Sequence, residues 1–512
     1  MSREKIIAKN TTLLYLRSLF GLLVSLYTSR IILNVLGVEN YGIYNVVGGM
    51  VAMFSLLSNS LSAAISRYLT FELGRENFKR LRIIFSSSVI IQLGMAVLIV
   101  LLAETVGVWY LNEYINLPDG RLGAAHWVLQ FSIISFVIGL ISVPYNAAII
   151  AHEKMKFFAY ISILEQVAKL LISYLLYISP FDKLIAYAFL LVVVSIGIRM
   201  VYGIYCKRNF EECNGKLVFD KNVIRNMSTF AGWNFLGACS TVLITQGVNI
   251  LMNLFFSVIV NAARGIATQI ENVVMGFVNN FTTAINPQIT KSYASGEGEY
   301  MFKLIYKGSK YSFFLVFIFA LPISLETDSI LSLWLGEVPS ITCDFIRLTL
   351  LVSLLSVISN TLVTAMLATG DIKKYQIVVG GTGMLIFPLV YLAYYIGMPP
   401  VASYIITFII FSIQLLYRLF LLRKMIQLSI RKFIKHVIMK DLFVLFSSAP
   451  LPIIMHYCIS FNNSSLKLLT ITIISVITTI LSVFFFGCDT EEKRLIVDKL
   501  TNIKHYVLPI RH

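Results

Sequence analysis

Charged residues are scarce in this sequence. Asp, Glu, Lys and Arg together make up 13% of the 512 residues, against roughly 25% in a typical soluble domain. Hydrophobic residues make up 57%, and the mean hydropathy is +0.80. A soluble chain of this length would divide into several domains, each with a polar surface. The composition cannot supply those surfaces, so it excludes a soluble protein and indicates a chain that crosses a membrane many times.

Cysteine and histidine are also few, and they are scattered. The six cysteines show neither the spacing of a metal site nor that of a redox pair. The six histidines are isolated, and we find no paired carboxylates, Gly-rich phosphate loop or nucleophile arrangement. The sequence therefore predicts no disulfide, no metal site and no cofactor.

Long apolar runs take the place of polar surfaces. A bilayer core of about 30 Å needs about 20 mostly apolar residues per helix, and fourteen such runs lie between polar or charged clusters. They predict an all-α, polytopic membrane protein with about fourteen transmembrane helices. The predicted cores are 11–36, 42–65, 83–109, 124–150, 157–178, 183–206, 228–256, 261–286, 311–335, 344–369, 376–397, 401–422, 441–460 and 467–487.

The basic residues sort to one side of these spans. Thirty-two of the 42 Lys and Arg residues fall in alternate segments that begin with 1–10 and end with 488–512, and the opposite segments hold three. Because positive residues favour cytoplasmic loops, both termini are predicted to be cytoplasmic. The net charge of +16 is then mainly a topology signal, and nucleic acid is excluded as a partner.

The two halves of the sequence show weak similarity at an offset of about 220 residues. Residues 64–79 resemble 284–303, and residues 148–156 resemble 365–373. Chance similarity between apolar segments is the alternative explanation. Two parallel repeats of six spans would place a substrate cavity between two bundles. The predicted domains are an N-lobe at 1–206, a cytoplasmic linker at 207–227, a C-lobe at 228–422, two extra helices within 423–487 and a cytoplasmic tail at 488–512.

Seven basic residues lie inside the predicted spans, where insertion scales put a cation at about 2.5–3.5 kcal/mol. Four of them can be explained by an ion pair or by closeness to the membrane interface: Lys169, which has Glu165 one helical turn earlier, and Arg199, Arg347 and Arg418. The other three, Arg17, Arg30 and Arg264, lack such an explanation. We expect them to face an aqueous cavity.

Polar side chains concentrate in the same spans as these arginines, and in the eighth span they recur at spacings close to 3.5 residues, as one helical stripe. Hydrogen bonds between helices are the alternative use for such groups. Acidic residues well inside the spans are few, which favours an anionic, phosphate-bearing substrate, because arginine suits phosphate. The candidate substrate-binding residues are Arg17, Arg30, Asn45, Asn249, Asn253, Arg264, Glu271, Asn272 and Asn279.

The beginning of the chain also carries a recognisable pattern. Leu14, Tyr15 and Arg17, the run Tyr-Thr-Ser-Arg at 27–30 and the run Leu-Gly-Val-Glu-Asn-Tyr-Gly-Ile-Tyr at 36–44 resemble the start of Wzx-like polysaccharide flippases. These are the O-antigen and capsule exporters of the multidrug/oligosaccharidyl-lipid/polysaccharide (MOP) superfamily. The resemblance covers the whole chain, and it implies a MATE-like fold of two six-helix lobes plus two C-terminal helices.

The resemblance further implies translocation of undecaprenyl-pyrophosphate-linked oligosaccharide across the bacterial cytoplasmic (inner) membrane. We expect alternating access, in which the lobes rock around a fixed cavity. Arg17, Arg30 and Arg264 would bind the pyrophosphate and the first sugars, and amide side chains would bind sugar hydroxyls. The implied partners are the lipid-linked oligosaccharide and membrane lipids, with a polysaccharide polymerase and chain-length machinery as further candidates.

Two alternatives remain open. A MATE-type multidrug or cation antiporter would share the fold, but the scarcity of acidic residues inside the spans disfavours a cationic cargo. A membrane-embedded polysaccharide polymerase or glycosyltransferase would need a sizeable extramembrane segment for its catalytic groups, whereas the longest segment on the non-cytoplasmic side is 110–123. The sequence does not choose between H⁺ and Na⁺ as a coupling ion.

Overall fold

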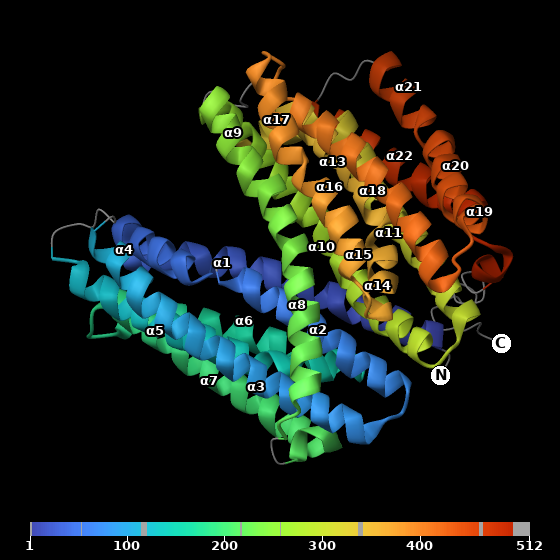
Figure 1. Cartoon of the computed structure of the whole chain (residues 1–512). Helices are drawn as coiled ribbons and strands as arrows, with labels where there is room; N and C mark the ends of the chain where they lie inside the picture. Colours follow the sequence, from blue (N-terminus) through green and yellow to red (C-terminus); the bar gives the residue numbers. More distant parts are fainter. Residues whose placement is uncertain are drawn as a thin grey trace, which may run out of the picture. The chain divides into compact units, whose positions relative to one another are not determined.

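The computed structural model is built from helices, as Figure 1 shows. It describes residues 3–52, 54–113, 120–215, 218–256, 258–335, 341–459 and 464–494. Within these ranges every regular element is an α, π or 3-10 helix, which confirms the predicted all-α class.

The helices follow one another with short connections. In chain order they are α1 (Arg3–Ala52), α2 (Ser55–Gly74), α3 (Phe78–Leu102), α4 (Val108–Glu113), α5 (Leu122–Ala151), α6 (Met155–Ile178), α7 (Lys183–Asn209), α8 (Lys221–Val242), α9 (Val248–Phe255), α10 (Val258–Ala294), α11 (Gly298–Leu325), α12 (Thr327–Leu335), α13 (Thr342–Ile358), α14 (Asn360–Thr369), α15 (Lys373–Tyr375), α16 (Gly381–Met384), α17 (Ile386–Tyr395), α18 (Ala402–Ile426), α19 (Ile430–Phe433), α20 (Met439–Ser448), α21 (Pro450–Cys458) and α22 (Ser464–Ser482).

Short π-helical turns continue several of these helices. A π turn inserts an extra residue into a helix and often marks a functional position. One 3-10 turn, η2 (Glu211–Asn214), follows α7. The π turns are η1 (Ala103–Gly107), η3 (Leu243–Gly247), η4 (Gln376–Gly380), η5 (Ile434–Ile438) and η6 (Val483–Gly487).

Eleven helical stretches of the described chain are long and apolar enough to cross a membrane. Each coincides with one predicted span. The three other predicted spans, 11–36, 42–65 and 261–286, lie on the more polar helices α1, α2 and α10. The structure thus confirms a polytopic helical protein, and the number fourteen stays a prediction.

The break predicted between the first two spans is a kink within α1. This helix has 50 residues and at ~1.5 Å per residue is far longer than a bilayer core. Gly37 interrupts it with φ 76° and ψ 167°, a conformation that glycine adopts without a Cβ clash. The chain therefore changes direction at Gly37 with almost no intervening loop.

The helices form two compact units. The first comprises Met1–Cys239, Thr283–Met301 and Leu367–Gln376, and the second comprises Ser240–Thr282, Phe302–Met366 and Ile377–His512. Two short stretches from the second half of the sequence thus belong to the first unit. The lobes at 1–206 and 228–422 stay a prediction.

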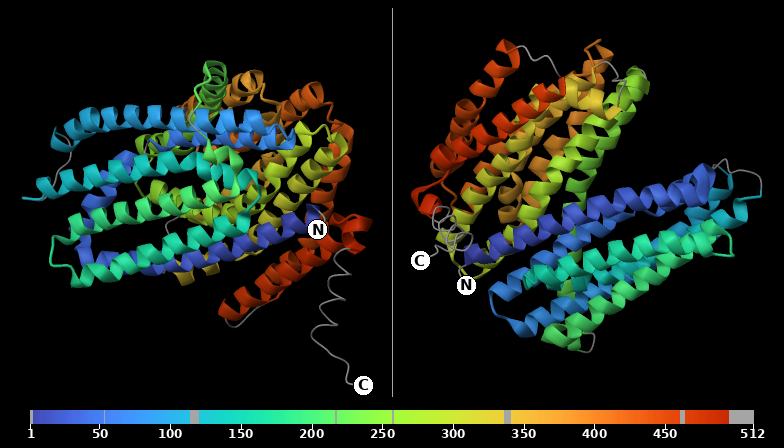
Figure 2. Two further views of the ribbon diagram at one scale, coloured as in Figure 1. Left: turned by 90° about the horizontal axis from the view of Figure 1, so that it is seen from below. Right: turned by 180° about the vertical axis from the view of Figure 1, so that it is seen from behind.

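Close helix packing holds the first unit together. α5 packs against α2, α3 and α7, and α1 packs along α6, as Figure 2 also shows. Leu69, Ile84, Ile149 and Met227 are fully buried in its largest hydrophobic cluster. Because lipid is as apolar as these side chains, tight packing rather than exclusion of water stabilises such contacts in a membrane.

One polar contact ties the end of α5 to the end of α10 within the first unit. Lys291 Nζ lies 2.5 Å from Glu153 Oε1, and Gln288 Nε2 donates a hydrogen bond of 2.5 Å to Glu153 Oε2. Both oxygens of one carboxylate are therefore held by the same neighbouring helix.

A second contact ties the end of α2 to the later stretches of the first unit. Arg67 Nη2 donates a 2.9 Å hydrogen bond to the Ala368 carbonyl oxygen. At Gly74 the backbones approach so closely that a Cβ would lie 2.8 Å from the Lys291 carbonyl oxygen. Any side chain at this position would push the two helix ends apart.

Candidate functional site

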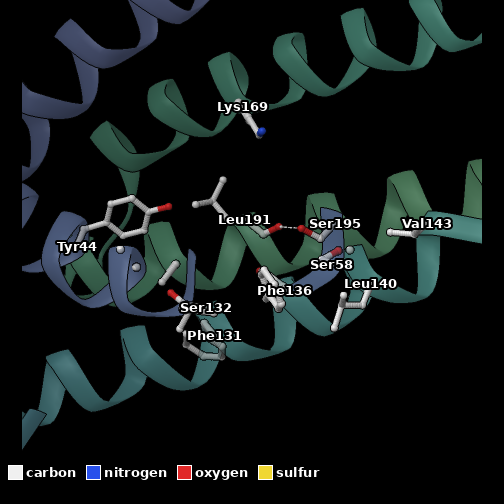
Figure 3. Close-up of a pocket in the computed structure, with 16 residues that line it drawn as sticks. Tyr44, Ser58, Phe131, Ser132, Phe136, Leu140, Val143, Lys169, Leu191 and Ser195 are labelled. Atoms are coloured by element: carbon white, nitrogen blue, oxygen red, sulfur yellow. Dashed lines mark hydrogen bonds between the residues drawn. The ribbon is translucent and has the colours of Figure 1, made fainter. Parts of the chain in front are cut away.

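A cavity of about 610 Å³ lies inside the first unit. Its walls come from α1, α2, α5, α6 and α7, and Figure 3 shows ten of its side chains with labels. The residues that line it are Tyr44, Gly48, Gly49, Val51, Ser58, Phe131, Ser132, Ser135, Phe136, Gly139, Leu140, Val143, Lys169, Ala188, Leu191 and Ser195.

Small and hydroxyl-bearing residues dominate this lining. The glycines of α1 and α5 add no side chain, so space remains between closely packed helices. Four serines and Tyr44 bring hydroxyl groups to the wall, and a serine hydroxyl both donates and accepts hydrogen bonds. Phe131 and Phe136 supply aromatic surface, and the Phe131 ring stacks on Trp127 with centroids 5.5 Å apart. The wall offers polar groups and flat apolar faces together.

Lys169 is the one charged residue among the described residues that line the cavity. Its Nζ lies 2.6 Å from Glu165 Oε1, and the two side chains are 39% and 38% exposed. The ion pair predicted from the i, i+4 spacing is thus present. Figure 3 shows the ammonium group pointing from α6 toward the space between the other lining residues, a location that the sequence did not predict.

The predicted arginine Arg17 lies in the first unit but not among the residues that line this cavity. It is half-buried on α1, and its guanidinium lies 4.9 Å from the ring centroid of Phe158 on α6. A cation over an aromatic face is stabilised by the ring quadrupole. Arg17 therefore already contributes to the packing of α1 on α6.

The side chains of Arg30, Asn45 and Asn253 lie outside the described residues. Their predicted roles in binding substrate stay predictions.

Arg264 belongs to the second unit and is engaged by a π turn. Its Nη2 donates to the carbonyl oxygens of Ile244 at 3.1 Å and Thr245 at 3.4 Å, both in η3. Its Nη1 lies 3.7 Å from the Met252 sulfur, and the guanidinium faces the Tyr404 ring at 5.9 Å. Arg264 thus satisfies backbone groups that a regular helix would satisfy internally.

Glu271 lies two helical turns after Arg264 on α10 and interacts with it electrostatically. Ser353 Oγ of α13 donates a 3.1 Å hydrogen bond to Glu271 Oε1. The structure thus brings Arg264 and Glu271 together, as the helical stripe predicted. Their shared surroundings form a polar cluster within the second unit.

The remaining predicted amides have mixed surroundings. Asn249 is half-buried on α9, whereas Asn272 and Asn279 are exposed on α10. Both exposed residues lie on the helix that carries Arg264 and Glu271, but nothing in the structure tests their role in binding.

Comparison with known proteins places the chain in a family. The family model described as "Polysaccharide biosynthesis protein" matches residues 7–293, more than half of the chain. A search of curated proteins by sequence returned no match.

Solved structures show the same fold. An outward-facing MATE family transporter of the MOP superfamily superposes with a TM-score of 0.72 at 11% identity, over 83% of this chain and 96% of that one. A MOP superfamily transporter from Pyrococcus furiosus, described as having a binding pocket of reverse polarity, gives 0.68 at 10% identity, over 83% and 96%. The MATE transporter ClbM in complex with Rb⁺ gives 0.68 at 14% identity, over 84% and 96%.

These matches confirm the resemblance seen at the start of the sequence and the predicted MATE-like fold. The family match covers α1 to α9 and nearly all of α10, so it includes the helices that enclose the cavity. The chain belongs to the polysaccharide biosynthesis protein family and has the fold of the MATE-type transporters of the MOP superfamily.

Proposed function

We propose that this protein is a flippase for lipid-linked oligosaccharide. Its substrate would be an undecaprenyl-pyrophosphate-linked repeat unit of O-antigen, capsule or exopolysaccharide, moved across the bacterial cytoplasmic membrane. The family match and the transporter fold support a membrane transporter of polysaccharide biosynthesis, and the cavity supports the class of cargo.

The lining of the cavity carries the proposal. Sugars present many hydroxyl groups and apolar ring faces, which match the serines and the two phenylalanines of the wall. The polyprenyl tail needs no polar partner and would remain in lipid. A lysine, rather than a carboxylate, is the charged residue at the described lining, which favours an anionic cargo over the cationic cargo of a multidrug antiporter.

Anion binding would be shared among basic residues. Lys169 is added to the predicted arginines Arg17, Arg30 and Arg264, because its ammonium group faces the cavity. Its partner Glu165 lies on the same helix, so a phosphate can replace that partner without moving a helix. The role of the four cations in binding pyrophosphate is part of the proposal.

Alternating access would act on the polar contacts between helix ends. Glu153 with Lys291, and Arg67 with Ala368, join segments that the distribution of basic residues predicts to be cytoplasmic. Opening toward the cytoplasm would require both contacts to break. They are therefore candidates for a cytoplasmic gate.

Deletion of the gene tests the proposed function. We expect one surface polysaccharide to disappear while its lipid-linked precursor accumulates in the inner leaflet. Single replacement of Arg17, Arg30, Arg264 or Lys169 by Ala should reduce that polysaccharide without reducing the amount of folded protein in the membrane. Normal export from all four variants would contradict the assignment of these cations.

Two further assays separate the alternatives. Increased drug susceptibility of the deletion strain, with normal polysaccharide, would indicate a multidrug antiporter instead. Formation of glycosidic bonds by the purified protein would indicate a polymerase or glycosyltransferase.

A further inference from the structure

A group of charged side chains lies inside the second unit, away from the residues discussed so far. Lys310 of α11 is 2% exposed, yet the sequence predicted it as a loop residue one position outside a span. In the structure it lies in the membrane-spanning stretch Gly298–Leu325. Its Nζ lies 2.9 Å from Glu492 Oε2 and 3.5 Å from Asp489 Oδ2.

The same two acids bind two further lysines. Lys440 of α20 pairs with Asp489 Oδ1 and donates to the Gly487 carbonyl oxygen at 3.3 Å. Lys307 Nζ of α11 lies 3.8 Å from Glu492 Oε1. The acids belong to the segment that follows η6. This segment is therefore held between α11 and α20 by ion pairs.

A third acid in this region has no hydrogen-bond donor. Asp441 of α20 is 2% exposed, and neither of its carboxyl oxygens accepts a hydrogen bond from any residue that the structure describes. Lys310 is the charged group that faces it, but the Lys310 ammonium is already bonded to Glu492 and Asp489. Tyr311 and Cys488 are the other titratable groups beside this network.

An ionised carboxylate in this position would be strongly destabilised. Burial of a charge without hydrogen bonds is so unfavourable that the group neutralises instead, and an acid inside a membrane span normally pairs or faces water. Asp441 does neither in the described structure. Protonation removes the charge and leaves the carboxyl group neutral.

We propose that Asp441 is a proton-binding site governed by the ion pair between Lys310 and Glu492. With that pair intact, Asp441 holds a proton. When the segment after η6 releases Lys310, its ammonium pairs with Asp441, and the proton leaves Asp441 Oδ to water. Proton binding is thereby linked to the position of the chain segment that contains Asp489 and Glu492. This site lies outside the cavity and does not depend on which substrate the protein carries.

Infrared spectroscopy of the purified full-length protein in lipid nanodiscs tests the proposal. At pH 7 the wild type should show carbonyl absorption from a protonated carboxyl group that Asp441→Asn lacks. Glu492→Gln removes the acid that holds Lys310, so Lys310 becomes available to Asp441 and the absorption should fall about tenfold, the change expected for ~1 pKa unit. Lys310→Met removes the competing cation, and the absorption should persist.

The variants also separate this proposal from a purely structural role. Asp489→Asn is the matched control, because it leaves the contact between Lys310 and Glu492 in place, and its absorption should equal that of the wild type. Equal carboxylic-acid absorption in the wild type and Asp441→Asn would overturn the proton site. Equal absorption in the wild type and Glu492→Gln would overturn the control by Lys310. Gel filtration verifies that each variant is folded before it is measured.

Discussion

Two membrane-embedded lysines, each paired with a glutamate, show how differently the two units use a buried cation. Lys169 pairs with Glu165 on its own helix, and both side chains are more than a third exposed to the cavity. Lys310 pairs with Glu492, a residue 182 positions later, and both are almost completely buried. A local, exposed pair contributes about 0–1 kcal/mol. Loss of one partner of a buried pair typically removes about 3–5 kcal/mol.

The difference concerns what the cation is free to do. Glu165 is fixed to Lys169 by helix geometry alone, so a ligand can take its place without unfolding anything. Glu492 joins a distant segment to α11, so its replacement would release that segment. The first pair suits binding and exchange, and the second suits the joining of segments and the control of Asp441.

The largest expected effect comes from breaking the buried pair. Lys310→Ala leaves Glu492 buried without its main partner and should lower the free energy of unfolding by about 3–5 kcal/mol, measured by thermal or denaturant unfolding in detergent. Lys307→Ala is the control, because its more distant contact with Glu492 should contribute less than about 1 kcal/mol. Equal losses in the two variants would erase the distinction between a buried and a peripheral pair.

An intermediate effect is expected for the contact between Glu153 and Lys291. Glu153→Ala removes the acceptor of two charge-assisted hydrogen bonds and should destabilise the protein by about 2 kcal/mol. The double variant Glu153→Lys, Lys291→Glu reverses the pair and should recover part of the loss. A reversed pair no more stable than Glu153→Ala would show that the attraction between the two charges contributes little.

A small effect on stability but a large effect on transport is expected for Lys169. Lys169→Gln should change the free energy of unfolding by less than about 1 kcal/mol. Export of polysaccharide should fall about tenfold or more, because a charge-assisted hydrogen bond contributes about 1.5–3 kcal/mol. Lys169→Arg keeps the charge and should retain most of the export. Wild-type export from Lys169→Gln would remove this lysine from the binding site.

The smallest effect concerns the pH dependence of stability at Asp489, which lies outside the spans. Burial raises the pKa of this carboxyl group, but the hydrogen bond from Lys440 and the charge of Lys310 outweigh it, so the pKa lies below its ordinary value. The unfolded state then binds the proton more tightly, and stability is lost as the pH falls through the acidic range. Because the side chain is 46% exposed, the contribution should be below about 1 kcal/mol. Asp489→Asn should remove this part of the acid dependence of the melting temperature, and an unchanged acid limb would contradict it.

Sequence periodicity and composition were sufficient for the fold. Apolar runs located every membrane-spanning stretch that meets the length and hydropathy criteria, because each run reflects contact with lipid on at least part of the helix. The ends were less certain. Lys310 was predicted outside a span because the sequence shows a charge and not the Glu492 that neutralises it 182 residues later.

The site was predicted only in part. Arg264 and Glu271 were expected on one face of a helix and do interact, since helical spacing is a local property. The cavity was missed because its serines and glycines lie on apolar spans, where a small residue is consistent with simple helix packing. Lys169 was explained by its neighbour Glu165, and nothing local shows that the pair borders an open space.

The π turn η3 gives Arg264 a mechanical role. Two backbone carbonyl oxygens of that turn depend on one guanidinium, and each would lose about 1–3 kcal/mol if left without a donor inside the membrane. An anion that draws Arg264 away must either compensate that loss or let η3 rewind into a regular helix. Rewinding changes the rotation of everything beyond it by one residue, about 100°. Ligand binding at Arg264 is therefore coupled to the twist of α9, as a key is coupled to the bolt it turns.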